Sequence, residues 1–371
     1  MEATTGWHYE TLCHRRPSRT PPPPNGVAVV MKKRRILVLM HEDLVPPDSL
    51  DGQSDKEIAR WKSEFDVLAT LRNMGHDAQP LGVYDDLGTI RRTIEAFKPH
   101  VHFNLLEEFH GVAIYDQHVV GYLELTRQAY TGCNPRGLML AHDKALCKQV
   151  LTYHRIPTPR FAVLPRGRRV RRPTGLQFPL VVKSVIEEAS MGISQASVVT
   201  SDEKFAERVA FIHEHVGTDA LAEQFIEGRE LYVGVMGNRR LQTLPVWEMV
   251  FRNMPENVPH IATARVKFDE EYQKRHGITT LRAENLPEGA EHRIQRICKR
   301  VYRALSLSGY ARMDLRLRDD GAVFVLEANP NPNLEYGEDF AESAEVRGIN
   351  YDALLDRIIQ LGLSYRAPWR G

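Results

Sequence analysis

Short apolar runs alternate with longer amphipathic segments in the first third of the chain. Residues 36–39 are all aliphatic and predict a buried strand. In residues 56–74 the apolar side chains recur at helical spacing, and Gly75 follows as a stop signal. A second strand comes next, and the pattern continues with a helix at 87–97, a strand at 101–104 and a helix at 117–126. This order predicts an open α/β domain with ligands at the carboxyl ends of its strands.

The rest of the chain is organised differently. Residues 138–154 predict a helix that carries Asp143 and Lys144, and residues 180–183 predict a strand that ends in Lys183. Residues 1–30 include four consecutive prolines and show no apolar periodicity. We therefore predict a disordered extension at 1–30, an N-terminal α/β substrate domain at 31–132, a central α+β lobe at 133–222 and a C-terminal α+β lobe at 223–371.

Composition narrows the class of partner. The chain has 371 residues, of which 42% are hydrophobic and 26% charged, with a net charge of +1. This balance gives no electrostatic bias toward nucleic acid or an anionic membrane, so we expect small-molecule partners. No apolar run approaches the length of a membrane span. The 4 cysteines show no CxxC spacing, which disfavours a disulfide framework or a zinc site and favours a reducing cytoplasm.

Two alternating runs near the C-terminus flank Asp320-Gly321, a dipeptide typical of a two-residue type I′ turn. With that turn, Asp314 lies opposite Glu327 and Arg312 lies opposite Asn329, so all four side chains share one face. The other face then packs into the core. Its expected members are Ala311, Met313, Leu315, Leu317, Ala322, Phe324, Leu326 and Ala328.

The facing carboxylates of Asp314 and Glu327 indicate a cation. At ~5 Å, two such charges repel by roughly 3 kcal/mol at an effective dielectric of ~20. Two carboxylates and the amide of Asn329, without Cys or His, form the kind of oxygen-rich site that suits Mg²⁺ together with phosphates. The alternative is a solvated hairpin face whose charges are neutralised by Arg312, Arg316 and Arg318.

Two further segments suggest a nucleotide site. Lys183 ends an apolar strand and could meet a phosphate, and the loop 187–194, which includes Ser190, has small residues whose N–H groups could cradle one. The segment 223–230 resembles an adenosine hinge. Structural alternatives remain open: Lys183 could extend to solvent at a strand end, and 223–230 could be an ordinary strand and turn. The chain contains no P-loop, GxGxxG, GxSxG or HExxH motif.

Taken in order, these motifs resemble the ATP-grasp superfamily, and within it the D-alanine–D-alanine ligases and their relatives. The resemblance extends from about residue 33 to the C-terminus. It rests on the segments 124–132, 143–144, 156–159, 181–183, 223–230 and 309–314, and most specifically on Leu326-Glu327-Ala328-Asn329-Pro330. It implies an ATP-grasp fold in which an N-terminal α/β domain accompanies two α+β lobes that enclose ATP.

The resemblance also implies roles for individual residues. Lys144 and Lys183 would hold the nucleotide phosphates, and Lys267 would reach the γ-phosphate. Arg312 would stabilise an oxyanion, and the loop 187–194 would close over the site. Adenosine would contact Glu223, Phe225, Ile226 and Glu230. Two Mg²⁺ ions, with Mn²⁺ as an alternative, would bind Asp314, Glu327 and Asn329. The implied reaction phosphorylates a carboxylate with ATP, and an amine then displaces phosphate to form an amide.

The chain departs from these ligases where substrates bind. The His-Gly…Gly-Glu-Asp-Gly segment of the ligases is not kept at residues 103–111. The segment 332–338 replaces their Pro-Gly-Met-Thr segment, and it contains the candidate substrate residues Asn333 and Glu338. Glu338 falls near a serine that receives the second substrate's carboxylate, and its charge would repel that group. We therefore expect an amine other than free D-alanine.

Other interpretations remain open. An authentic D-alanine–D-alanine ligase would be recognised by its product, whereas an ATP-grasp kinase would phosphorylate a hydroxyl and need no amine. A non-catalytic protein would bind Mg-ATP without turnover. A homodimer is compatible with the sequence, because related ligases are often dimers, but no feature of this chain requires one.

Overall fold

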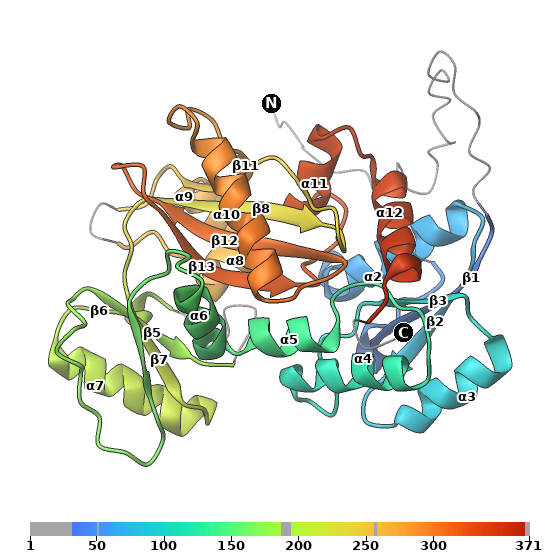
Figure 1. Cartoon of the computed structure of the whole chain (residues 1–371), viewed down its shortest axis with the longest axis horizontal. Coiled ribbons are helices and arrows are strands. Elements are labelled where there is room, and N and C mark those ends of the chain that lie inside the picture. Colours follow the sequence, from blue (N-terminus) through green and yellow to red (C-terminus); the bar gives the residue numbers. More distant parts are fainter. Residues whose placement is uncertain (1–31, 50–51, 187–193, 256–257, 368–371) are drawn as a thin grey trace. The chain divides into compact units, whose positions relative to one another are not determined.

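The computed structural model describes residues 32–49, 52–186, 194–255 and 258–367. The predicted extension at 1–30 and the candidate Ser190 lie outside these described residues. Three β-sheets are present in the described part, one from each successive region of the chain (Figure 1). The domain boundaries given above remain predictions. No helix of the described residues is long and apolar enough to cross a membrane.

The N-terminal sheet is parallel, with the strand order β2-β1-β3. Its elements are β1 (Arg35–His41), α2 (Asp55–Asn73), β2 (Asp77–Val83), α3 (Leu87–Phe97), β3 (Val101–Asn104) and α4 (Asp116–Leu125). The central strand β1 is covered on both faces. Leu37 and Leu39 belong to the core that contains residues of α3 and α4, whereas Ile36 and Val38 pack in the core that contains α2 and α12 (Tyr351–Ser364). This burial explains the unbroken apolar run of the strand.

The central sheet is antiparallel and has the order β4-β7-β5-β6. Its strands are β4 (Phe161–Leu164), β5 (Leu180–Ser184), β6 (Val198–Val199) and β7 (Ala220–Gln224), and α7 (Asp202–Phe211) packs on it.

The prediction of one helix at 138–154 is wrong. The chain breaks at Asp143 between α5 (Pro135–His142) and α6 (Lys144–Tyr153), because the Asp143 carboxylate accepts the N–H groups of Ala145 and Leu146 and thereby caps α6.

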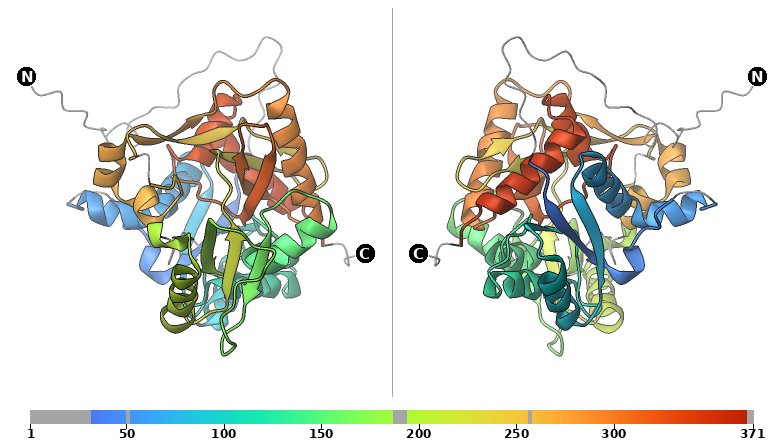
Figure 2. Two further views of the ribbon diagram at one scale, coloured as in Figure 1. Left: turned by 90° about the vertical axis from the view of Figure 1, so that its left-hand side faces the viewer. Right: turned by 90° about the vertical axis from the view of Figure 1, so that its right-hand side faces the viewer.

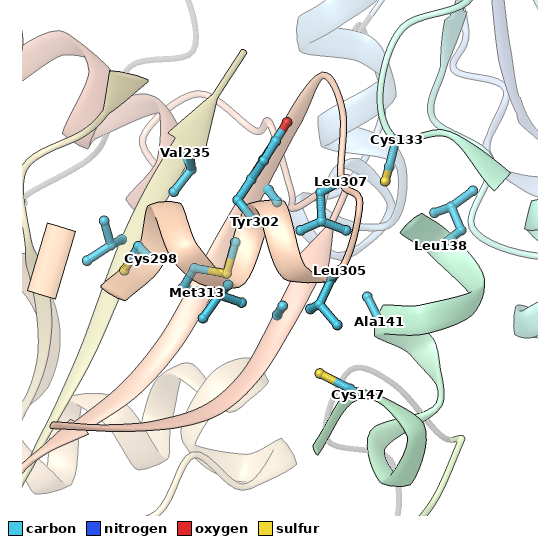
Figure 3. Packing of buried hydrophobic residues seen from close by; sticks show 14 of the residues in the cluster. Cys133, Leu138, Ala141, Cys147, Val235, Cys298, Tyr302, Leu305, Leu307 and Met313 are labelled. Atoms are coloured by element: carbon cyan, nitrogen blue, oxygen red, sulfur yellow. The ribbon is translucent and has the colours of Figure 1, made fainter. Parts of the chain in front are cut away.

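The C-terminal sheet carries the predicted hairpin and has the main order β11-β10-β8-β12-β13. Its strands are β8 (Arg229–Met236), β9 (Gln242–Thr243), β10 (Trp247–Phe251), β11 (Ile278–Arg282), β12 (Tyr310–Leu317) and β13 (Val323–Pro330). The accompanying helices are α8 (Ala264–Phe268), α9 (Glu270–His276), α10 (Ala290–Ala304) and α11 (Asp339–Val346). Cys298 and Tyr302 of α10 lie against this sheet near Met313 and Val235, in a core that continues to Cys147 of α6 (Figure 3).

The last helix of the chain returns to the first sheet. Leu354, Leu355, Ile358 and Ile359 of α12 are fully buried in one core with the β1 and α2 side chains. Figure 2 shows α12 beside the N-terminal strands in its right-hand view. The C-terminal segment thus contributes to the packing of the N-terminal sheet, a contact that spans almost the whole described chain.

The hairpin turn differs from the prediction. Arg318 N–H donates to Ala322, so the loop has three residues, 319–321, and Gly321 adopts a φ of 78° at its end. Opposite residues near the turn are therefore shifted by one: Leu315 faces Val325, not Leu326. A β-bulge between Asp314 and Leu315 then restores the expected register.

The bulge changes which residues of β13 reach the core. Val323 and Val325 are buried there, whereas the expected core residues Phe324 and Leu326 are only half-buried, as is Ala322. The predicted alternation is thus wrong for these three residues. It holds for Ala328, which follows the bulge.

Candidate active site

The polar face of the β12–β13 hairpin has the predicted pairing. Asp314 lies opposite Glu327, and Arg312 lies opposite Asn329. Arg312 donates from Nε and Nη2 to the two oxygens of Asp314, at 2.8 and 3.0 Å, and from Nη1 to Asp339 of α11 at 3.2 Å. This two-point contact fixes the guanidinium plane beside the carboxylate pair.

The other two arginines of the hairpin do not neutralise this pair. Arg316 donates to Glu230 at 2.6 Å, and Arg318 pairs with Asp320 at 3.1 Å. The alternative of a merely solvated face is also disfavoured by burial, because Asp314 is only 4% exposed.

Positive charges from three other elements converge on Glu327. Burial would raise the pKa of this carboxyl, but Lys183 of β5, Lys144 of α6 and Lys267 of α8 lower it to about 2. The pKa of Asp314 moves the other way, to about 6, because burial outweighs its contact with Arg312. Cations from distant parts of the sequence therefore act on Glu327, and a concentration of positive charge of this kind suits a polyphosphate.

The residues predicted to bind metal fit a hard cation. Two carboxylates face each other across the strands, and the side-chain amide of Asn329 on the same face of the hairpin has an oxygen that can ligate the same cation. No group of three or more His, Cys, Asp or Glu side chains in the described part could hold a metal. The candidate site thus consists of two carboxylates and one amide, which are donors that Mg²⁺ accepts when phosphate and water complete its shell.

Lys183 makes a contact that sequence reasoning missed. Both oxygens of Glu223 are paired: one with Lys183 and the other with Lys148, each at 2.7 Å. Lys148 is 1% exposed and also donates to the carbonyl of Leu326 at 2.9 Å and to Thr158 at 3.2 Å. The sequence feature that could have indicated this contact is the position of Lys148 on α6, one helical turn after Lys144 and next to the buried face of the helix.

The hinge segment lies beside a cavity of about 360 Å³ that is lined by Glu230, Met249, Phe251 and His260 among others. Glu230 accepts from Arg316 and, at 3.0 Å, from the Tyr232 hydroxyl. In the hinge itself, the N–H of Phe225 donates to Pro179 at 3.1 Å and Ile226 is buried. If adenine binds at this hinge, its hydrogen bonds must therefore be made with backbone groups other than the Phe225 N–H.

The segment 331–338 connects the hairpin to α11. Asn333 is exposed, and its side chain accepts the N–H of Glu335 at 2.9 Å, so it stabilises the turn. Glu338 directly precedes α11 and is exposed. Lys62 of α2 holds this segment through Glu335 at 2.8 Å and the carbonyl of Tyr336 at 3.1 Å.

Glu64 is a buried carboxylate on the same helix as Lys62. Its side chain faces negative neighbours: burial raises its pKa to about 7, and the charges of Glu107 and Glu335 act in the same direction. In the unfolded chain this pKa is about 4.5. The folded state consequently binds more protons than the unfolded state between these two values.

This difference predicts a pH-dependent stability. As pH rises from 4.5 to 7, ionisation of Glu64 is expected to destabilise the folded state by up to about 3 kcal/mol, because each pKa unit corresponds to ~1.4 kcal/mol. Glu64→Gln cannot ionise, so the variant should gain stability over the wild type across this range. Urea unfolding of both proteins at pH 5 and pH 8 measures the effect. An unchanged difference in unfolding free energy between the two pH values would contradict it.

Comparison with known proteins identifies the family. A family model described as the D-ala D-ala ligase C-terminus matches residues 150–360. The D-alanine–D-alanine ligase of Desulforudis audaxviator is 30% identical over 318 residues, which cover 84% of this chain and 96% of that protein. The ligase of Nitratidesulfovibrio vulgaris strain DP4 is 31% identical over 314 residues, or 82% of this chain and 96% of that protein.

A solved structure agrees. The D-alanine–D-alanine ligase from Bacillus anthracis complexed with ATP superposes with a TM-score of 0.67 and 24% identity, and the match covers 89% of this chain and 97% of that one. The expected ATP-grasp fold and the class of ATP-dependent carboxylate–amine ligases are thereby confirmed. The chain belongs to the D-alanine–D-alanine ligase-like family of the ATP-grasp superfamily.

Proposed function

We propose that this chain uses Mg-ATP to join a small carboxylic acid to an amine other than free D-alanine. The observation that carries the proposal is the convergence of the positive charges of Lys183, Lys144 and Lys267 on Glu327, which faces the buried Asp314 across the hairpin. A carboxylate oxygen of the acid attacks the γ-phosphorus, and the bond from that phosphorus to ADP breaks. The amine nitrogen then attacks the acyl carbon, phosphate leaves and the nitrogen loses a proton, which gives the amide.

The residues have distinct tasks in this proposal. Lys144, Lys183 and Lys267 bind and orient the phosphates, because phosphoryl transfer needs positioning and charge neutralisation rather than a protein nucleophile. Arg312, held by Asp314 and Asp339, places positive charge where the oxyanion develops during amine attack. Asp314, Glu327 and Asn329 would hold Mg²⁺, which supplies Lewis-acid neutralisation of the transferring group when bound.

Glu223 and Glu230 are proposed to act at the nucleoside side. Glu230 lines the cavity beside the hinge and is fixed by Arg316, so one of its oxygens could accept a ribose hydroxyl. Glu223 orients Lys183 and Lys148, and we propose that it reaches adenosine only when Lys183 turns to the phosphates.

We further propose that the protein is located in the cytoplasm. The homodimer stays a prediction.

A substrate matrix tests the proposed function. The purified protein is incubated with Mg-ATP and pairs of amino acids and small carboxylic acids, phosphate release is measured, and the products are analysed by mass spectrometry. We expect release that requires both an acid and an amine and yields their condensed mass. ADP formation with a phosphorylated hydroxyl compound would instead favour a kinase. Efficient formation of D-alanyl-D-alanine with ordinary saturation would contradict the choice of amine.

The position of Glu338 leads to a specific prediction. If its charge excludes a carboxylate-bearing amine, Glu338→Ser should improve kcat/KM for D-alanine as the amine on the order of ten-fold, because like charges in a binding site disfavour the wrong partner. Steady-state phosphate release against D-alanine concentration measures the effect. Glu345→Gln removes a charge from an exposed site on α11 and serves as the control. Equal D-alanine kinetics in Glu338→Ser and the wild type would rule this role out.

A further inference from the structure

Arg316 of β12 is a buried cation that holds three acceptors. Its residue is 4% exposed, and it lines the cavity of about 360 Å³ beside the hinge. It donates from Nη1 to the carbonyl of Gly228 at 2.7 Å and from Nη2 to Oε2 of Glu230 at 2.6 Å. Nη2 also donates to the carbonyl of His260. One side chain thus joins the hinge, β8 and the segment 258–263 that precedes α8.

The segment 258–263 leads directly to Lys267. The carbonyl of Ile261 accepts the N–H of Thr263 at 2.9 Å. Thr263 is the N-cap of α8, and its hydroxyl accepts an N–H of the first turn at 3.2 Å. The carbonyl of Thr263 accepts the N–H of Lys267 at 3.0 Å. Backbone and capping hydrogen bonds therefore connect the region that Arg316 holds with the helix that carries Lys267.

The two ends of this connection are fixed in different ways. α8 is anchored by Val266, which is 1% exposed and packs in a small core with Tyr232. At the other end His260 is exposed, and its ring stacks on that of Phe251 with 4.9 Å between the centroids. A hydrogen bond from a charged donor is stronger than one between neutral groups. The contact with Arg316 therefore restrains an end of the connection that burial does not.

We infer that Arg316 is a positioning residue for phosphoryl transfer, which holds the segment 258–263 so that Lys267 is placed at the γ-phosphate. The inference rests on the proposed function, in which Lys267 binds that phosphate. A misplacement of ~1 Å in such a site can reduce the rate on the order of a hundred-fold, so this restraint matters for turnover. The same guanidinium fixes Glu230, and Arg316 thereby connects nucleoside recognition with phosphate positioning.

Binding measurements without turnover test the inference. Isothermal titration calorimetry on the full chain with Mg²⁺ compares ADP with β,γ-methylene ATP, and the ratio of the two affinities reports the contribution of the γ-phosphate. We expect the wild type to bind the ATP analogue about ten-fold more tightly than ADP, the factor that one hydrogen bond to a charged group contributes. In Arg316→Met this ratio should fall to about one, because a displaced Lys267 no longer makes that bond.

Two comparisons separate this role from a merely structural one. Arg318→Met removes an exposed arginine at the turn of the same hairpin and should keep the wild-type ratio. Lys267→Met should lower the ratio by itself, and adding Arg316→Met to it should change the ratio no further, because the two residues act as a unit. A structural Arg316 would instead change stability, or both affinities equally, and leave the ratio intact.

Three outcomes would overturn the inference: an unchanged ratio in folded Arg316→Met, equal affinities for both nucleotides in the wild type, or a ratio in the double variant that differs from that of Lys267→Met. If Arg316→Met fails to fold, Glu230→Gln/Arg316→Met replaces it and is compared with Glu230→Gln alone, because removal of both charges leaves no buried carboxylate without its partner. The ligase proposal fails separately: a ratio that depends on Arg316, in a protein that forms no amide in the substrate matrix, would contradict the reaction but not this role.

Discussion

Glu327→Gln is expected to reduce turnover by about a thousand-fold, since metal neutralisation of a transferring group contributes several kcal/mol and each ~1.4 kcal/mol is a factor of ten in rate. Glutamine keeps the size of the side chain but removes the charge on which Lys183, Lys144 and Lys267 converge. It also removes one of the two carboxylates that face each other across the hairpin. Metal binding and phosphate positioning should both fail.

Two measurements check this result. Phosphate release with an active substrate pair gives kcat, and electron paramagnetic resonance of Mn²⁺ gives metal binding without any turnover. Glu288→Gln makes the same chemical change at an exposed position before α10 and should retain wild-type values in both. A Glu327→Gln protein that keeps more than a tenth of wild-type turnover, or binds Mn²⁺ with unchanged affinity, would exclude Glu327 as a metal ligand.

The sequence predicted the class of fold because its signals were local. Alternation of apolar strands with amphipathic helices was sufficient for the N-terminal sheet, where β1 is covered on both faces. The helix at 138–154 was predicted as one piece because its apolar spacing continues through Asp143. The break depends on a side-chain cap whose strength periodicity does not reveal.

In the hairpin, the predicted pairing of the functional residues is correct although the turn from which it was predicted is wrong. The pairs Asp314–Glu327 and Arg312–Asn329 were predicted from a two-residue turn that is not present. A three-residue loop shifts the register by one, and the bulge at Leu326 shifts it back. Alternation alone could not reveal the bulge, because the groups that hold it come from more than 150 residues earlier, as the sequence separations of 178 and 167 show for Lys148 and Thr158.

Substrate residues were the least predictable part. Asn333 and Glu338 were proposed from a family comparison of one segment, and their surroundings depend on Lys62 of a distant helix. Glu64 gave no signal at all, because a single acidic residue in an amphipathic helix usually faces solvent. Its raised pKa depends on burial and on acidic residues of three elements, α2, the loop after β3 and the segment before α11, which are far apart in the sequence.

The bulge and the buried ion pairs lead to the largest expected change in stability. Lys148→Met should destabilise the protein by about 3 kcal/mol or more, because it leaves several buried acceptors without their donor, at ~1–3 kcal/mol for each such group. Glu223 would retain only Lys183, and the carbonyl of Leu326, now held by Lys148 at 2.9 Å, would lose its donor. Since Leu326 is the extra residue of the bulge, the carboxylate of Glu327 beside it should also lose its fixed position.

Urea unfolding of Lys148→Met beside the wild type measures the loss of stability, and the exposed Lys204→Met on α7 is the matched control, expected within about 0.5 kcal/mol of the wild type. The activity of the folded fraction separates two roles of Lys148. If the lysine only stabilises the core, kcat of Lys148→Met below its melting temperature equals that of the wild type. If it also positions Glu327 through the bulge, kcat falls and the Mn²⁺ affinity falls with it. Wild-type stability in Lys148→Met would show that the Lys148–Glu223–Lys183 contacts contribute nothing to the fold.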